Sequence, residues 1–328
     1  MWVGFLVVGF CAPVCRVGWR LRRFSARDLG CSVAGFLVYA FIGGLVLSCA
    51  LFLFMLASLE GYSDAVFRLL ASRHGADLCF SEMAHVEALL RGNRGSVEKL
   101  VSFGAPFQVQ VLSTGEAVFE RFLGGFEAPD GFRGFNLNLS CPSRDVIRRG
   151  KGAAMVKRAA KTQRLVSLVR EYGFPVSVKI RLGLNSFEKD NRLYLNSLGG
   201  VDPDFFVVHA KHALQGSGED EDYSVYPECV EAARGIPVIA NGGIDSVEKV
   251  EMLRGMGVGG VMIGRAALFN PGIFDLLKNE LGYNVPVRRV PGLEELRGEY
   301  REIYGEFGGQ ERYFDDFMRV LGRGGVMY

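Results

Sequence analysis

The sequence predicts an α/β fold, a (β/α)8 (TIM) barrel with a short C-terminal helical appendage. From residue 51 onward, eight short apolar runs alternate with longer helix-like segments. The runs are continuously apolar, as parallel strands covered by helices on both faces are. The eight repeats cover about 225 residues, close to the length of such barrels. A doubly wound sheet is the competing fold, but no Gly-x-Gly-x-x-Gly motif follows the first strand.

The predicted elements follow one another in regular alternation. The strands are expected over 51–56, 78–81, 107–112, 134–139, 176–180, 205–208, 238–240 and 260–263. The clearest helices are expected over 64–74, 115–122, 153–172, 225–234 and 247–256. A helical pattern over 293–321 follows, interrupted by Gly308 and Gly309. We therefore divide the chain into an N-terminal extension (1–50), a barrel (51–280) and a short helical tail (281–328).

The extension has an ambiguous composition. Residues 1–14 are almost wholly apolar, a basic segment follows, and residues 31–59 are apolar again. Because 51–56 is needed as the first strand, only 32–50 remains for a membrane span, which needs about 20 residues. A membrane anchor, a buried extra helix and a mistranslated upstream region are all open. The anchor is not favoured, and we expect a cytoplasmic protein.

Composition excludes several classes of protein. The net charge of +2 excludes a globally basic nucleic-acid coat, although local patches stay possible. Seven scattered Cys form no CxxC pair, and the four His make no metal-ligand spacing with them. We expect no metal site and no disulfides, as in a reducing compartment.

Four features stand at the predicted carboxyl ends of barrel strands, where catalytic groups of such barrels gather. Cys141 ends an apolar run in Asn-Leu-Asn-Leu-Ser-Cys-Pro-Ser, and Lys179 ends another as an inward-facing cation that needs an anion or acceptor. Asn241-Gly-Gly and Gly264-Arg265 follow the last two strands, where these barrels commonly bind phosphate. His209 ends the sixth strand, but a lone His there is more often structural.

These stretches resemble the tRNA-dihydrouridine synthases. The resemblance rests on Asn-Leu-Ser-Cys-Pro-Ser, Arg-Gly-Lys-Gly-Ala-Ala, Val-Lys-Ile-Arg-Leu-Gly, Ala-Asn-Gly-Gly-Ile and Ile-Gly-Arg-Ala-Ala-Leu-Phe-Asn-Pro. It extends from about residue 51 to residue 274. The chain departs from the family pattern in five places: Ser58-Leu59 stands for Pro-Met, Ser140 for Gly, and Lys211 for Arg in His-x-Arg. Gly243 stands at a position that is often acidic, and the helical tRNA-binding region after the barrel is abbreviated.

The resemblance implies an FMN enzyme that reduces a uridine in tRNA, with NADPH as the reductant. The implied cofactor-binding residues are Ser58, Leu59, Glu60, Gln110, Lys179, His209, Asn241, Gly242, Gly243, Gly264 and Arg265. The implied catalytic residue is Cys141. The implied contacts to uridine and RNA are Asn138, Arg144, Arg148, Arg149, Lys151 and Lys211.

The residue types agree with this chemistry. The C5=C6 bond of uracil is conjugated to the C4 carbonyl, so a hydride can add at C6 and a proton is then needed at C5. A neutral thiol such as Cys141, with an ordinary pKa of about 8.5, is a suitable acid for that step. A basic run over 144–164 begins three residues after Cys141 and suits binding to an RNA backbone. A solvent-exposed helix face would show the same charge pattern.

Two other functions stay open. A free-pyrimidine oxidoreductase resembling dihydroorotate dehydrogenase would carry a similar Asn-Leu-Ser-Cys-Pro string and would act on a small molecule. A non-catalytic relic, which binds RNA or is tethered to a membrane, would explain the unusual N-terminus and the short tail. The first would ignore tRNA, and the second would purify without flavin.

Overall fold

A computed structural model describes residues 38–42, 45–49, 52–113, 115–216 and 218–322. The chain divides into two units, residues 1–52 and 53–328. In the first unit, β1 (Val38–Ile42) and β2 (Leu45–Cys49) pair antiparallel. A continuous helix over 38–49 is therefore excluded, while residues 1–37 of the extension, with the apolar run over 1–14, lie outside the described residues. No helix in the described part of the chain is long and apolar enough to cross a membrane.

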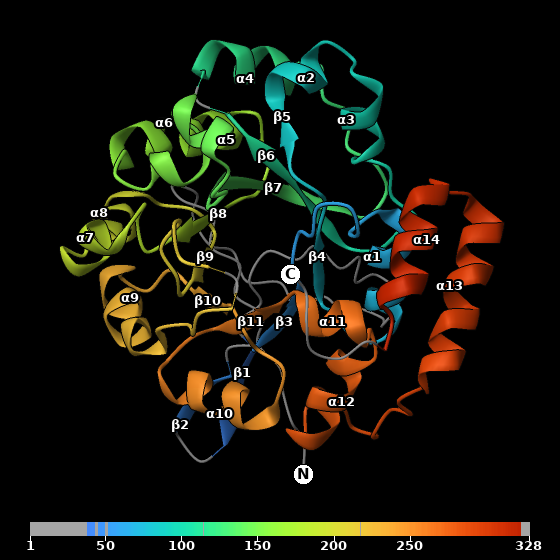
Figure 1. Ribbon diagram of the computed structural model, residues 1–328. Coiled ribbons are helices and arrows are strands. Elements are labelled where there is room, and N and C mark those ends of the chain that lie inside the picture. Colours follow the sequence, from blue (N-terminus) through green and yellow to red (C-terminus); the bar gives the residue numbers. More distant parts are fainter. Residues whose placement is uncertain (1–37, 43–44, 50–51, 114, 217, 323–328) are drawn as a thin grey trace, which may run out of the picture. The chain divides into compact units, whose positions relative to one another are not determined.

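The second unit is a closed barrel of eight parallel strands, which confirms the predicted fold class (Figure 1). The strands are β3 (Leu53–Leu56), β4 (Leu78–Phe80), β6 (Phe107–Leu112), β7 (Phe132–Leu139), β8 (Val176–Arg181), β9 (Phe206–His209), β10 (Val238–Asn241) and β11 (Gly260–Ile263). The pairing of β4 with β6 closes the ring. A further short strand, β5 (Ala84–His85), pairs with the end of β6.

Helices surround this ring, as Figure 1 shows. The predicted helices appear as α1 (Ala65–Arg73), α4 (Glu116–Leu123), α6 (Ala159–Glu171), α9 (Tyr226–Ala232) and α10 (Val247–Gly255). Shorter ones are α2 (Val86–Leu90), α3 (Arg94–Glu98), α5 (Arg144–Arg148), α7 (Ser186–Asp190), α8 (Leu193–Gly200), α11 (Arg265–Phe269) and α12 (Ile273–Glu280). Two short 3-10 turns, η1 (Gly152–Met155) and η2 (Tyr223–Val225), complete them.

The prediction of one helix over 153–172 is wrong at its start. Residues 152–155 form the separate turn η1, and α6 begins at Ala159. The cause is a tertiary contact: the N–H of Ala153 donates to the carbonyl of Cys141 at 3.1 Å. This bond holds the segment against the end of β7 instead of letting it join the helix.

The tail forms two helices, α13 (Leu293–Phe307) and α14 (Glu311–Val320), and the predicted break at Gly308 and Gly309 separates them. Both pack against α1: α13 contacts it directly, and the ring of Phe317 in α14 lies 5.3 Å from that of Phe67 in α1. Figure 1 shows α14 next to α1. Leu296, Tyr300 and Ile303 recur at helical spacing and are buried, so the tail packs as an extension of the barrel core.

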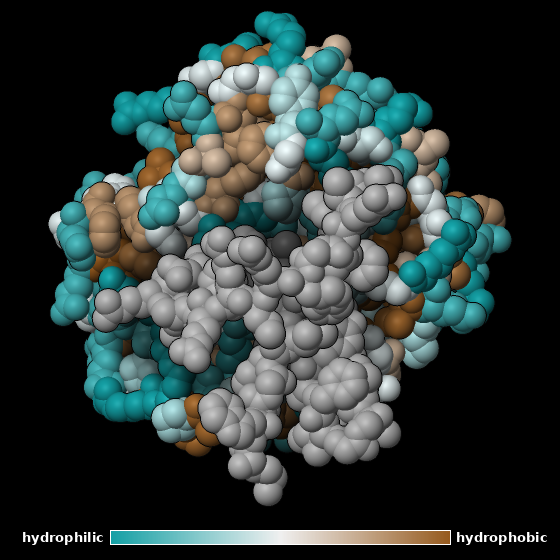
Figure 2. All heavy atoms as spheres, turned by 180° about the vertical axis from the view of Figure 1, so that it is seen from behind, coloured by the Kyte–Doolittle hydropathy of each residue, from teal (hydrophilic) through white to brown (hydrophobic). Residues whose placement is uncertain are grey.

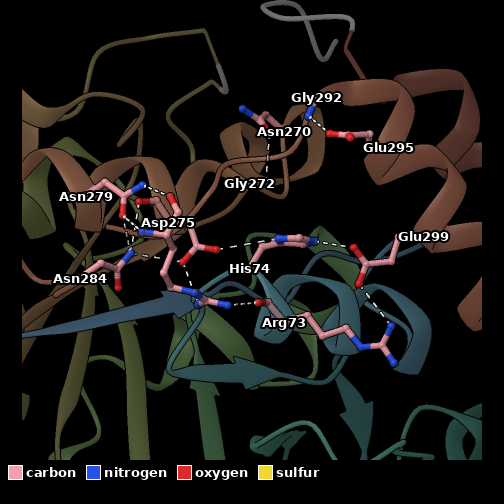
Figure 3. Close-up of polar contacts among 11 residues, drawn as sticks. Arg73, His74, Asn270, Gly272, Asp275, Asn279, Asn284, Gly292, Glu295 and Glu299 are labelled. Carbon is pink, nitrogen blue, oxygen red and sulfur yellow. Dashed lines mark hydrogen bonds and ion pairs between the residues drawn. The ribbon is translucent and has the colours of Figure 1, made fainter. Parts of the chain in front are cut away.

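A polar network joins the tail to the end of α1 (Figure 3). His74 lies between two carboxylates, with Nε2 2.6 Å from Glu299 of α13 and Nδ1 3.8 Å from Asp275 of α12. Asp275 is buried and also binds Arg288 at 2.8 Å. Arg288 in turn donates to the carbonyl of Arg73. These bonds tie the segment after the barrel to the first barrel helix.

Candidate active site

A cavity of about 860 Å3 opens at the carboxyl ends of the barrel strands, within the size range of small-molecule sites. It brings together most of the residues singled out from the sequence. The lining includes Ser58, Leu59, Glu60, Gln110, Asn138, Cys141, Lys179, His209, Asn241, Gly242, Gly243, Gly264 and Arg265. Lys211 and the basic residues after Cys141 are not part of this lining. Within the described residues, no three His, Cys, Asp or Glu side chains cluster as metal ligands would.

Asn138 shapes the turn that presents Cys141. Its Oδ1 accepts hydrogen bonds from the N–H of Ser140 at 2.9 Å and from that of Cys141 at 2.8 Å. The other side of the turn rests on Gly152, which has a φ of +58°. A Cβ at this glycine would lie 2.7 Å from the carbonyl oxygen of Cys141, so only glycine fits here without displacement.

A chain of amide hydrogen bonds holds Asn138 from inside the barrel. Its Nδ2 donates to Gln110 at 2.7 Å, and Gln110 donates to Asn136 at 2.8 Å. Asn136 donates to Ser177 at 2.7 Å, and the Ser177 hydroxyl donates to Gln108. All five side chains are buried, and a satisfied buried network of this kind fixes side-chain orientation. The Cys141 turn is therefore held from the barrel interior.

The Cys141 thiol is protonated at neutral pH. Burial raises its pKa most, and the nearby Glu60 carboxylate raises it further. The N–H of Ser143 and the charge of Arg181 act in the opposite direction. The thiol is only partly enclosed and faces the cavity. This arrangement gives the cavity a neutral proton donor.

Lys179 is a buried cation in the same cavity. Burial lowers its pKa to about 7, with a smaller contribution from the Arg181 charge. Its ammonium group donates to Oδ1 of Asn241 at 2.6 Å, and Asn241 donates to the carbonyl of Met262 at 2.8 Å. A buried ammonium with one neutral acceptor gains from an anionic or electron-rich ligand.

One end of the cavity is strongly cationic. The pKa of His209 is well below its usual value because of burial, and then because Lys179, Arg181, Lys211 and Arg265 surround it with positive charge. His209 is therefore neutral. Two acids oppose these cations. The carboxylate of Glu221 lies 3.1 Å from Lys211 and 4.0 Å from Arg265, and Asp245 lines the cavity and pairs with Lys249 at 2.8 Å. An excess of positive charge at this end suits an anionic group.

The turn of Gly242 and Gly243 forms part of that end. Both residues have positive φ values, +116° and +56°. A Cβ at Gly242 would lie 2.7 Å from Cγ of Glu221, so a larger residue would displace the acid or the turn. The carbonyls of the two glycines accept bonds from Tyr223 and Lys249, each at 2.7 Å. The turn is thus fixed in place.

The basic residues after Cys141 divide into two groups. Arg144, Arg148 and Arg149 lie in or next to α5 and are exposed. Lys151 is buried and paired with Glu87 at 2.6 Å. Lys211 is likewise buried in its pair with Glu221. Of these five residues, the three arginines present their charge on the surface.

Arg181 and Glu221 are among the residues of the site that sequence reasoning missed. Arg181 lines the cavity and stands two positions after Lys179 on β8. Because side chains alternate along a strand, the inward direction of Lys179 already predicted the same direction for Arg181. Glu221 lies in an acidic loop after β9 that carries no periodic signal, so only the tertiary structure reveals it.

Comparisons with known proteins agree with this site. The family model for dihydrouridine synthase (Dus) matches residues 55–322. The tRNA-dihydrouridine synthase B of Xanthomonas campestris pv. campestris is 32% identical over 223 residues, covering 67% of each chain. A probable tRNA-dihydrouridine synthase of Helicobacter pylori is 30% identical, covering 77% of this chain and 78% of its own. The match to the family model begins within β3 and contains the rest of the barrel, the Cys141 turn and the tail helices, and the chain is therefore a member of the dihydrouridine synthase family.

Proposed function

We propose that this protein reduces a uridine of tRNA to 5,6-dihydrouridine, with FMN as its cofactor and NADPH as the reductant. The observation that carries the proposal is the neutral Cys141 thiol, held on a braced turn, which faces the same cavity as a buried lysine and a cationic corner. A single cavity thus contains a proton donor, an ammonium group that can bind an electron-rich ring, and a cationic corner that can bind a phosphate. Because tRNA is the proposed substrate, we expect the protein to work in the cytoplasm.

The residues present fit FMN. In the cationic corner, Arg265 and the turn of Gly242 and Gly243 would hold the phosphate, with Asn241 and Gly264 beside them. His209, being neutral, would contribute a hydrogen bond there. Lys179 would meet the electron-rich edge of the ring, while Gln110, Ser58, Leu59 and Glu60 would line its faces and rim. When bound, FMN supplies the hydride that adds at C6 of uracil.

Cys141 then completes the reduction. Addition at C6 leaves an enolate across C5 and the C4 carbonyl, and C5 takes the proton of the Cys141 thiol. A serine hydroxyl would be too weak an acid for this step. Asn138 would place the uracil ring indirectly, since its side chain is occupied in holding the Cys141 turn.

The RNA would lie over the surface beside α5. Arg144, Arg148 and Arg149 are exposed there, within a few residues of Cys141. Arginine side chains bind phosphate oxygens and would hold a tRNA whose uridine is turned into the cavity. We assign Lys151 and Lys211 a supporting role, because both are buried in ion pairs. The exposed arginines favour tRNA over a free pyrimidine as substrate.

The test uses purified protein, NADPH and an unmodified tRNA transcript, with free uracil and orotate as parallel substrates. We expect a yellow protein and a two-hydrogen mass gain in one tRNA nucleoside. Cys141→Ala should keep its flavin and lose the product. Cys229→Ala, a buried cysteine of α9, is the control and should keep both. Turnover of a free pyrimidine alone would replace this proposal with the small-molecule oxidoreductase, and a colourless, inactive protein would support a relic.

A further inference from the structure

Arg181 connects two loops that border the cavity. It is the last residue of β8, and its side chain lines the same cavity as Cys141. The Nε of Arg181 donates to the carbonyl of Ser140 at 2.9 Å. Nη1 donates to the carbonyl of His212, in the loop after β9, at 3.2 Å. A single planar guanidinium therefore joins the Cys141 turn to the neighbouring loop.

The residue before Cys141 is held from two sides. Asn138 accepts from the N–H of Ser140, while Arg181 donates to its carbonyl. With both backbone groups of Ser140 bonded, the Cys141 backbone that follows has little freedom to rotate. This pair of bonds holds the backbone from which the thiol projects.

Arg181 also sets the charge near the sulfur. The ionisable groups that act on the thiol are Arg181 from β8 and Glu60 from the segment after β3, and they oppose each other. The N–H of Ser143, in the turn itself, adds a hydrogen bond to the sulfur. Burial lowers the pKa of Arg181, while the charge of an ionised Cys141 in return raises it, as the charge of Glu221 does. Arg181 is thus the cation whose charge acts on the sulfur.

We propose that Arg181 is a positioning residue for Cys141, which aims the thiol into the cavity and stabilises the thiolate left after proton donation. The inference rests on the proposed function. In that step the S–H bond breaks and a C5–H bond forms, while the electron pair stays on sulfur until solvent returns a proton. NADPH, through the flavin, supplies the hydride at C6. The guanidinium accepts no proton; it lowers the energy of the charge that the transfer creates.

Arginine is suited to this role in a way that lysine is not. Its planar fork reaches two carbonyl oxygens in fixed directions and keeps its charge at any accessible pH. A lysine would keep the charge but would lose one of the two carbonyl bonds. Charge and position can therefore be separated by comparing substitutions to lysine and to glutamine.

The first experiment measures the alkylation rate of Cys141 by iodoacetamide against pH, read on the Cys141 peptide by mass spectrometry so that other cysteines do not interfere. Removing a facing cation from a thiol raises its pKa, here by about one unit. In Arg181→Gln the midpoint should rise by that amount, and alkylation at pH 7 should slow about tenfold. Arg181→Lys should keep a midpoint near that of the wild type. Arg170→Gln removes an exposed arginine of α6 and should change nothing.

The second experiment measures uridine reduction by the same variants. Arg181→Gln should lower kcat about tenfold at pH 7 with little change in KM for tRNA, and the alkaline limb of its pH profile should move upward. Arg181→Lys should keep the alkaline limb and lose part of kcat, since one carbonyl bond is gone. If Arg181 had only a structural role, its substitution would lower the rate without moving the alkaline limb of the pH profile.

The outcomes separate this inference from the proposed function. An unchanged alkylation midpoint in Arg181→Gln overturns the role of Arg181, even if the wild type reduces tRNA. If Arg181→Gln does not fold, Arg181→Met, which also removes the charge, decides: a midpoint raised by about a unit supports the role, and one near the wild-type value overturns it. A shifted midpoint in a protein that leaves all tRNA unchanged keeps the inference about the thiol and removes the proposed reaction.

Discussion

Lys179 is the residue at which burial and function conflict most directly. A lysine with a pKa of about 7 is partly neutral at working pH, and its buried position costs free energy unless a ligand favours the charged form. The sequence places this residue at the end of an apolar strand, where stability alone would select an apolar side chain. Its presence indicates that a ligand, and not the barrel core, determines this position.

This conflict predicts a pH dependence of cofactor binding. If FMN favours the ammonium form, affinity is highest below the free-state pKa of about 7. As pH rises above 7, binding must first protonate Lys179, so affinity should fall by up to about tenfold per unit. Fluorescence titration of FMN between pH 7 and 9.5 measures this slope. Lys179→Met keeps the other titrating groups of the site. It should bind FMN more weakly, and its affinity should change much less with pH. Equal slopes in both proteins would remove Lys179 from the cofactor site.

At the scale of the element, the Cys141 turn depends on a segment that lies eleven residues further along the chain. Gly152→Ala would place a Cβ against the carbonyl of Cys141 and the side chain of Val146. We expect a loss of about 1–3 kcal/mol in unfolding free energy, together with a large drop in activity because the turn must move. Chemical denaturation and single-turnover assays measure the two effects.

Gly173→Ala is the matched control. Gly173 follows α6, also has a positive φ, +79°, and a Cβ there would meet nothing within 4 Å. Its substitution should cost only the backbone strain, about 1–2 kcal/mol, and leave activity intact. Equal activity in both variants would show that the turn tolerates displacement.

The junction between barrel and tail gives a second prediction at this scale. Asp275 is buried and binds Arg288, while His74 lies beside it (Figure 3). Asp275→Asn leaves the arginine without its carboxylate and should lower the unfolding free energy by about 1–3 kcal/mol. Glu294→Gln breaks the exposed pair with Arg297 and should change it by less than about 0.5 kcal/mol. Similar losses in both variants would contradict a special role for the buried carboxylate.

Sequence patterns predicted the repeating elements better than their ends. Apolar runs locate all eight barrel strands because each is buried on both faces. Three of the predicted strands end one residue too early, because their last residues are polar: Asn241, Arg181 and His209. These residues still pair in the sheet, and their side chains face the cavity. The strand β5 is too short to show any period. The turn η1 owes its form to a contact with Cys141, and no local pattern encodes that contact.

The site was predictable to the extent that strand ends could be found. Thirteen residues expected at the site do line one cavity, because carboxyl ends of parallel strands meet at one end of a barrel. The exposure of each cation was not predictable. Lys151 and Arg149 belong to the same basic run. Lys151 is buried and paired with Glu87 of α2, whereas Arg149 is exposed to solvent.

At the scale of the whole molecule, the described surface in the view of Figure 2 is mostly hydrophilic, with hydrophobic residues scattered among them. The net charge is only +2, so attraction to RNA must come from local groups. The exposed arginines of α5 and its C-terminal end are such a group, within reach of the proposed active site.

These arginines should control tRNA affinity and its dependence on salt. Each phosphate contact contributes about one unit to the slope of log affinity against log salt. Arg144→Gln and Arg149→Gln should therefore each weaken binding and lower the slope by up to about one, while flavin content stays constant. Filter binding at several salt concentrations measures this. Arg170→Gln, at the C-terminal end of α6, is the control. Unchanged slopes in the α5 variants would place the RNA elsewhere.

The most direct test of the account is mass spectrometry of tRNA nucleosides from cells that lack this gene, complemented with the wild type or with Cys141→Ala. We predict that one uridine loses its two-hydrogen increment in the absence of the gene. The wild-type gene should restore the increment, and Cys141→Ala should not. Dihydrouridine that is unchanged at every position, or restored equally by Cys141→Ala, would contradict the proposed reaction and the role of its thiol.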